Sequence, residues 1–214
     1  MSKSAIIDRL INPGIIAIIR ANSSEQLLGA AQALYDGGVT AMEVTMTTPN
    51  ALGVISEVAK RFGSKVLIGV GSVLDTETCR AAILAGSEFV VTPVTRPEVI
   101  KMCNRYGKPI ASGAYTPTEA INAYEAGADF VKIFPADQLG PQYIKNILAP
   151  MPQLPIIPTG GVNLQTVEAF IKAGCVALGA GSSLVSKDIL QNQDWKKLTE
   201  TSAAFVEAIR KARA

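Results

Sequence analysis

One lysine lies inside an otherwise apolar run, FVKIFPA at residues 130–136. The alternation of a β-strand puts Phe130, Lys132 and Phe134 on one face of this run. A run that is apolar on both faces is typical of a parallel strand covered on each side. A lysine in such a place either finds a carboxylate or loses its proton, because desolvation disfavours the ammonium. A neutral amine in a dry pocket attacks carbonyl carbon and forms a Schiff base, so Lys132 is a candidate nucleophile.

A carboxylate with comparable placement occurs in the earlier run AMEVTMT, residues 41–47. Its polar residues Glu43, Thr45 and Thr47 alternate with apolar ones, so Glu43 is expected to point into the interior that Lys132 faces. A buried Glu–Lys ion pair is one interpretation, since buried charges are normally paired. The other makes Glu43 a general acid/base beside an amine nucleophile.

Two glycine-containing segments, PTGGVN and GAGSS, end the last two β-like runs. In a barrel of eight parallel strands, phosphate sites are often built from the loops after strands 7 and 8. Glycines there let backbone N–H groups approach an anion closely, although glycines also end strands for steric reasons alone. The two segments together predict an anion site, with candidate residues Thr159, Gly160, Gly161, Gly181 and either Ser182 or Ser183.

Arg20 ends the first β-like run. It is either an exposed surface charge or, facing inward, a bidentate clamp for a substrate carboxylate. Ser72, at the end of the third run, is placed to hydrogen-bond the same carboxylate. Pro93 closes the fourth run, and we interpret it as shaping the pocket, which Thr45 and Phe134 would also line.

Short β-rich runs alternate with amphipathic stretches along the whole sequence. The runs cover residues 14–20, 41–47, 65–71, 89–93, 109–115, 130–136, 155–161 and 177–183. Between them helices are expected, among others over 23–38, 75–86, 116–127 and 163–174, several with capping residues at the start and AG or GG at the end.

Parallel strands joined by right-handed crossovers predict an α/β fold that closes into a (β/α)8 TIM barrel. We expect one domain over residues 1–214, with a short leading helix at 2–12 and a closing helix at 194–213. A doubly wound open sheet is the structural alternative, but the turn after the first run lacks the glycines of a dinucleotide-binding fingerprint.

Composition excludes several classes of function. A net charge of +2 with 18% charged residues predicts no nucleic-acid partner. The early apolar run is too short to span a bilayer and no signal-peptide layout precedes it, so a soluble, cytoplasmic protein is expected. The sequence has no histidine, which excludes a Ser–His–Asp triad and histidine metal ligands. Three cysteines without a CxxC pattern argue against a disulfide framework and a zinc site and are expected to be buried.

Taken in order, the segments IIRAN, GGVTAMEVT, GVGSVLD, FVVTP, FVKIFPA, GPQYIK, PTGGVN and GAGSSLV resemble the bacterial KDPG/KHG aldolases over nearly the whole chain. That resemblance implies a small class I aldolase that forms a homotrimer and works without metal or other cofactor. It makes Lys132 the Schiff-base lysine and Glu43 the proton shuttle. It also matches Gly160, Gly161, Gly181 and Ser182 to phosphate-binding segments and puts Ser72 in place of a carboxylate-binding threonine.

One departure from the family pattern bears on the substrate. Many members read EVTLRT, where the arginine helps to hold the substrate carboxylate, whereas this chain reads EVTMTT with Thr47 at that position. Members that lack the arginine carry one at the end of strand 1, so Arg20 is the candidate replacement. The segment LGPQYIK is also similar to a segment of the 2-keto-3-deoxy-6-phosphogalactonate aldolases, so 2-keto-3-deoxy-6-phosphogalactonate stays an alternative substrate.

The predicted function is cleavage of 2-keto-3-deoxy-6-phosphogluconate to pyruvate and D-glyceraldehyde 3-phosphate, with 4-hydroxy-2-oxoglutarate as a further substrate. The galactonate epimer is the first alternative. A barrel isomerase or thiamine-phosphate-type synthase is the second, with Lys132 then pairing a substrate anion. A catalytically silent ligand-binding barrel is the third, and the presence of both Lys132 and Glu43 argues against it.

Overall fold

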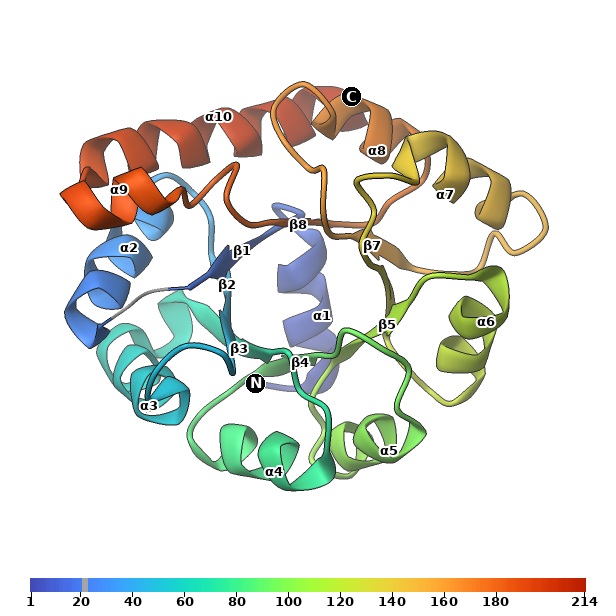
Figure 1. The fold of residues 1–214 in the computed structure, drawn as a ribbon, viewed down its shortest axis with the longest axis horizontal. Coiled ribbons are helices and arrows are strands. Elements are labelled where there is room, and N and C mark those ends of the chain that lie inside the picture. Colours follow the sequence, from blue (N-terminus) through green and yellow to red (C-terminus); the bar gives the residue numbers. More distant parts are fainter. Residues whose placement is uncertain (21–22) are drawn as a thin grey trace.

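The computed structural model of the protein describes residues 1–20 and 23–214, so Ala21 and Asn22 of the IIRAN segment lie outside the described residues. Eight parallel strands follow one another in the order β7-β6-β5-β4-β3-β2-β1-β8. They form a ring with helices around its outside (Figure 1). The strands are β1 (Ile15–Ile19), β2 (Ala41–Thr45), β3 (Leu67–Gly71), β4 (Phe89–Val91), β5 (Ile110–Ala114), β6 (Phe130–Ile133), β7 (Ile156–Pro158) and β8 (Leu178–Ala180). Each lies within a run marked in the sequence, and the predicted (β/α)8 barrel is confirmed.

Except for the first, which precedes β1, the helices connect or follow successive strands and cover the outer face of the ring (Figure 1). They are α1 (Lys3–Ile11), α2 (Ser24–Asp36), α3 (Ala51–Phe62) with the 3-10 turn η1 (Gly63–Lys65), α4 (Thr76–Leu84), α5 (Pro97–Arg105), α6 (Pro117–Glu125), α7 (Gly140–Leu148), α8 (Val167–Lys172), α9 (Lys187–Asn192) and α10 (Trp195–Arg213). The expected leading and closing helices are α1 and α10. Within the described residues, none of these helices combines the length and apolar character that a membrane span requires.

The helix expected from Asn163 begins later than the sequence suggested. Asn163 Oδ1 accepts hydrogen bonds from the backbone N–H groups of Gln165 at 2.9 Å and Thr166 at 3.1 Å. This side-chain turn competes with helix formation, so α8 starts at Val167 with Thr166 as its N-cap. The prediction of a helix start at Asn163 was therefore wrong.

The two faces of the strands pack into separate apolar clusters, as the alternation predicts. The inner cluster fills the N-terminal end of the ring with residues such as Phe89 and Phe130. Helix α1 closes this end, and its Ile6 and Leu10 belong to the same cluster; α1 is visible through the ring in Figure 1. The packed floor leaves the opposite end, where the strands terminate, to carry polar groups.

All three cysteines are free and buried, as the sequence led us to expect. Cys79 in α4 and Cys103 in α5 are distant in sequence, but their Sγ atoms lie 3.5 Å apart between the two helices. Cys175 is surrounded by apolar groups, and burial raises the pKa of its thiol to about 12.

Candidate active site

Lys132 lies in the wall of the ring on β6, which pairs it with Gly113 on β5 and Ile157 on β7, and it is only 6% exposed. Its Nζ lies 4.9 Å from the centre of the Phe134 ring, a cation–π distance. In the described part of the chain, no salt bridge joins Lys132 to Glu43 or to another carboxylate. The interpretation as a structural ion pair with Glu43 therefore does not hold in the described residues.

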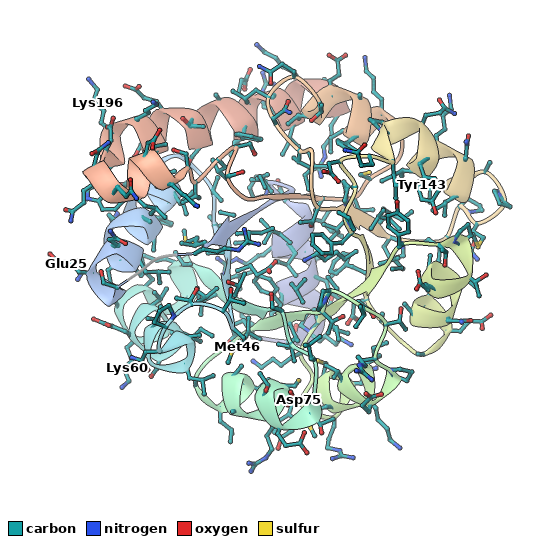
Figure 2. The ribbon with its side chains drawn as sticks, viewed as in Figure 1. Glu25, Met46, Lys60, Asp75, Tyr143 and Lys196 are labelled. Atoms are coloured by element: carbon teal, nitrogen blue, oxygen red, sulfur yellow. The ribbon has the colours of Figure 1, made fainter. Side chains whose placement is uncertain are left out.

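Glu43 points into the ring from β2, which lies across the barrel from β6 in the strand order, and it is 3% exposed. Its carboxylate packs against the backbone of β3. A Cβ added to Gly71 would lie 2.5 Å from the carboxylate carbon of Glu43, so only glycine leaves space for the acid at this position. Figure 2 shows side chains projecting into the ring interior, and the low exposure of Glu43 means that little solvent reaches the acid.

An open cavity of about 350 Å³ lies at the ends of β7 and β8. Gly160 and Gly161 in its wall have φ values of 99° and 70°, the left-handed region that glycine adopts without strain. This backbone leaves no side chain between the loop and a ligand. The described lining residues are Ile18, Arg20, Phe134, Thr159, Gly160, Gly161, Val162, Asn163, Gly179, Gly181, Ser182 and Ser183. The structure thus brings the candidate phosphate-binding residues together.

The two serines at the end of β8 have different surroundings. The Ser183 hydroxyl donates to the backbone carbonyl of Val162 at 2.6 Å. Ser182 makes no such bond within the described residues and lines the same cavity. Of the two serines that the sequence left open, Ser182 is therefore the one whose hydroxyl is available to an anion.

Arg20 faces this cavity as well. Ile18, two residues earlier on the inner face of β1, lines it too, so the alternation of the strand continues one step beyond its end. Arg20 is exposed at the rim and lies with the glycine loops, whereas Ser72 is not among the described lining residues. Arg20 is thus exposed and also borders the cavity, and its role as a carboxylate clamp stays a prediction.

Comparison with known proteins identifies the family and the fold. A sequence profile described as KDPG and KHG aldolase matches residues 6–201. The chain belongs to this family. It is 36% identical to a 2-dehydro-3-deoxy-6-phosphogalactonate aldolase of Escherichia coli, over 92% of this chain and 95% of the relative. It is 30% identical to a 2-dehydro-3-deoxy-phosphogluconate aldolase of Haemophilus influenzae, over 96% and 97%.

A solved KDPG aldolase from Legionella pneumophila, with pyruvate captured as a covalent carbinolamine intermediate, superposes with a TM-score of 0.84 at 28% identity, covering 90% of this chain and 93% of that one. The aldolase described here is thus a carbon–carbon lyase of a family that acts on small phosphorylated keto acids. The family assignment replaces three alternatives from the sequence: a barrel isomerase, a thiamine-phosphate-type synthase and a catalytically silent ligand-binding barrel.

In this aldolase the loop after β3 carries Ser72 in a left-handed conformation with φ of 61°, which is uncommon for a residue other than glycine. The loop ends at Asp75, which caps α4 by accepting a hydrogen bond from Thr78 N–H at 2.6 Å. Hydrogen bonds from Thr78 also lower the pKa of the Asp75 carboxyl. Figure 2 labels Asp75 at the start of α4. The hydrogen-bonded N-cap at Asp75 therefore fixes one end of the short loop that carries Ser72.

The remaining predicted residues lie at the ends of β2 and β4. Thr45 is buried and its hydroxyl lies 2.8 Å from that of Thr47, which is exposed. Pro93 is half-buried, and a Cβ on Gly113 would overlap its backbone, so the chain after β4 crosses closely over β5 beside Lys132. This close crossing supports the interpretation of Pro93 as a residue that shapes the pocket.

Sequence reasoning missed the residues that hold this site in place. Gly71 accommodates the Glu43 carboxylate, and nothing in the GVGSV segment alone reveals that contact. Thr166 Oγ1 donates to the carbonyl of Gly161 at 2.8 Å and braces the first glycine loop. The Asn163-x-x-Thr166 spacing, typical of a side-chain-stabilised turn, was the available signal.

A larger hollow of about 490 Å³ lies outside the barrel between α2 and α10. Its described lining residues include Gly29 and Trp195, and none of the candidate site residues borders it. We therefore assign the chemistry to the smaller cavity and the adjoining ring interior.

Proposed function

We propose that this chain is a class I, Schiff-base aldolase that cleaves 2-keto-3-deoxy-6-phosphogluconate to pyruvate and D-glyceraldehyde 3-phosphate. The observation that carries the proposal is Lys132, a buried amine without a carboxylate partner in the described structure, on the wall opposite Glu43. An unpaired lysine in a confined site is suited to attack a carbonyl carbon.

In the proposed mechanism the Lys132 amine attacks the C2 ketone, and Glu43, directly or through one water, moves the protons of carbinolamine formation and loss of water. The protonated imine accepts the electron pair of the C3–C4 bond when the C4 hydroxyl proton is removed. That bond breaks and the aldehyde leaves. The enamine is then protonated at C3, and water hydrolyses the imine to release pyruvate and the free amine.

Substrate recognition is proposed at the two ends of the keto acid. The phosphate would bind the glycine loops, with the residues Thr159, Gly160, Gly161, Gly181 and Ser182. The carboxylate would bind near Ser72 and Thr47, while Thr45, Pro93 and Phe134 shape the space around the imine. Arg20 is proposed as the guanidinium that replaces the arginine missing at Thr47, and its position in the lining of the glycine-loop cavity makes the phosphate its alternative partner.

The galactonate epimer is a second candidate substrate. The Escherichia coli relative of 36% identity is a 2-dehydro-3-deoxy-6-phosphogalactonate aldolase. The Legionella pneumophila protein, in which pyruvate is held as a covalent carbinolamine, supports the lysine chemistry for either epimer. The two substrates differ at C4 and give the same products, so only epimer-pure substrates separate them.

The experiment is a steady-state assay in which pyruvate release is coupled to lactate dehydrogenase. We would supply each C4 epimer separately and 4-hydroxy-2-oxoglutarate as the substrate without phosphate. We expect the highest kcat/KM with the gluconate epimer. Lys132→Arg should abolish turnover because the guanidinium stays protonated, and Glu43→Gln should leave slow imine formation with impaired turnover. Wild-type activity in Lys132→Arg would overturn the proposed mechanism.

We further propose that residues 1–214 fold as one domain in the cytoplasm and assemble as a homotrimer, as the family resemblance implies. Light scattering coupled to gel filtration tests the assembly. The proposal expects a mass three times that of the 22.5 kDa chain, and a monomer at assay concentration would contradict it.

A further inference from the structure

The barrel closes at a seam that, within the described chain, lacks the continuous ladder found between the other neighbouring strands. Ladders join every neighbouring pair of strands from β7 through to β8 along the sheet order. Where the ring closes between β7 and β8, the described residues form one isolated bridge, between Thr159 and Gly179, and a backbone hydrogen bond from Val176 N–H to the Ile156 carbonyl at 3.0 Å. Figure 1 shows these two strands side by side. The closing edge therefore depends on contacts other than a backbone ladder.

The anion-binding cavity lies over this seam. Its glycines come from both edges, Gly160 and Gly161 after β7 and Gly181 after β8. A tetrahedral anion that accepts hydrogen bonds from both loops needs them at a fixed separation. The spacing across the seam is thus a determinant of anion affinity, and the described backbone pairing beside the cavity is the bridge between Thr159 and Gly179.

One side chain bridges the two loops directly. The Ser183 hydroxyl, on the β8 side, donates to the Val162 carbonyl on the β7 side at 2.6 Å. On the β7 side, the Thr166 hydroxyl donates to the Gly161 carbonyl, and the Asn163 side chain accepts from the backbone of the turn. These bonds stabilise the loop internally, so the position of Val162 is coupled to that of the glycines.

We propose that Ser183 is a positioning residue that holds the two phosphate-binding loops at their working separation across the β7–β8 seam. It acts through Val162 and the glycine loops, while Ser182 supplies the free hydroxyl to the ligand. This inference rests on the proposed phosphate site and adds the residue that sets the distance between its two loops. A single hydrogen bond of this kind corresponds to roughly a three- to tenfold change in an equilibrium constant.

The test compares Ser183→Ala with Ser183→Thr, which keeps a hydroxyl, and with Ser4→Ala, an exposed serine of α1 far from the site in sequence and element. Inorganic phosphate binding is measured by calorimetry, and amide hydrogen exchange of residues 159–163 is measured without ligand. KM and kcat are determined for the phosphorylated keto acid and for 4-hydroxy-2-oxoglutarate.

We expect Ser183→Ala to raise the phosphate Kd and the KM for the phosphorylated substrate about three- to tenfold, with kcat retained. Exchange at 159–163 should be faster, cleavage of 4-hydroxy-2-oxoglutarate should be unchanged, and Ser183→Thr should restore wild-type values. Ser4→Ala should match the wild type in every measurement.

Unchanged exchange and unchanged phosphate binding in Ser183→Ala would overturn the positioning role while leaving the proposed function intact. Weakened phosphate binding with unchanged exchange would also overturn it, because Ser183 would then be a direct ligand. If the wild type itself binds no phosphate, the proposed phosphate site fails, and the role of Ser183 fails with it.

Discussion

Replacing Gly71 with alanine is the sharpest test of how Glu43 is held. The new Cβ would lie 2.5 Å from the Glu43 carboxylate carbon, whereas non-bonded carbon atoms settle at about 3.5–4.0 Å. The carboxylate therefore has to retreat by roughly 1 Å or more. A misplacement of about 1 Å at a reacting group can lower turnover about 100-fold, so we expect kcat to fall by about that factor. KM should change much less, since the glycine loops are untouched.

The matched control is Gly69→Ala, one inward position earlier on the same strand. The three atoms nearest to its Cβ would all belong to the ring of Phe89 in the barrel floor, one of them at 2.5 Å, whereas those nearest to a Cβ on Gly71 all belong to Glu43. Both variants should lose about 1–3 kcal/mol of unfolding free energy through overpacking. Only Gly71→Ala should lose kcat and change its pH–rate profile. A Gly71→Ala enzyme with wild-type kcat, or an equal loss of kcat in Gly69→Ala, would refute the reasoning.

Three further predictions follow from burial and charge. Leu10→Ala, in the helix that closes the barrel floor, should lower the free energy of unfolding by about 2–5 kcal/mol in denaturant titrations, with kcat retained. Burial raises the pKa of the Cys175 thiol from 9.0 to about 12, so it stays protonated between those values. At pH 9, iodoacetamide should therefore label Cys175 in guanidinium but not in the native protein, and rapid native labelling would contradict the burial. Arg20→Met should raise KM more for the phosphorylated substrate than for 4-hydroxy-2-oxoglutarate if the guanidinium serves the phosphate; an equal rise would assign it to the carboxylate.

Much of the fold could be predicted because its signals are local. Alternation along single strands placed Glu43 and Lys132 on the inner face. The helix expected from residue 116 begins with the expected kind of capping residue, since Thr116 and Glu119 form a capping box at the start of α6. Each of these features depends on residues only a few positions apart.

The rest of the site depends on contacts between distant segments. Gly71 matters because of a side chain on another strand, and the two thiols of Cys79 and Cys103 meet only when α4 packs on α5. The choice between Ser182 and Ser183 depended on a carbonyl of the neighbouring loop. No periodicity in one segment encodes such pairings, and so the sequence left them open.

The central claim is that Lys132 forms the imine. We would incubate the protein with pyruvate, reduce it with sodium borohydride and locate the added mass by peptide mass spectrometry, with Lys132→Arg as the control. The account predicts a reduced pyruvyl adduct on Lys132 that is absent from the variant. No adduct, or an adduct on a different lysine, would contradict it.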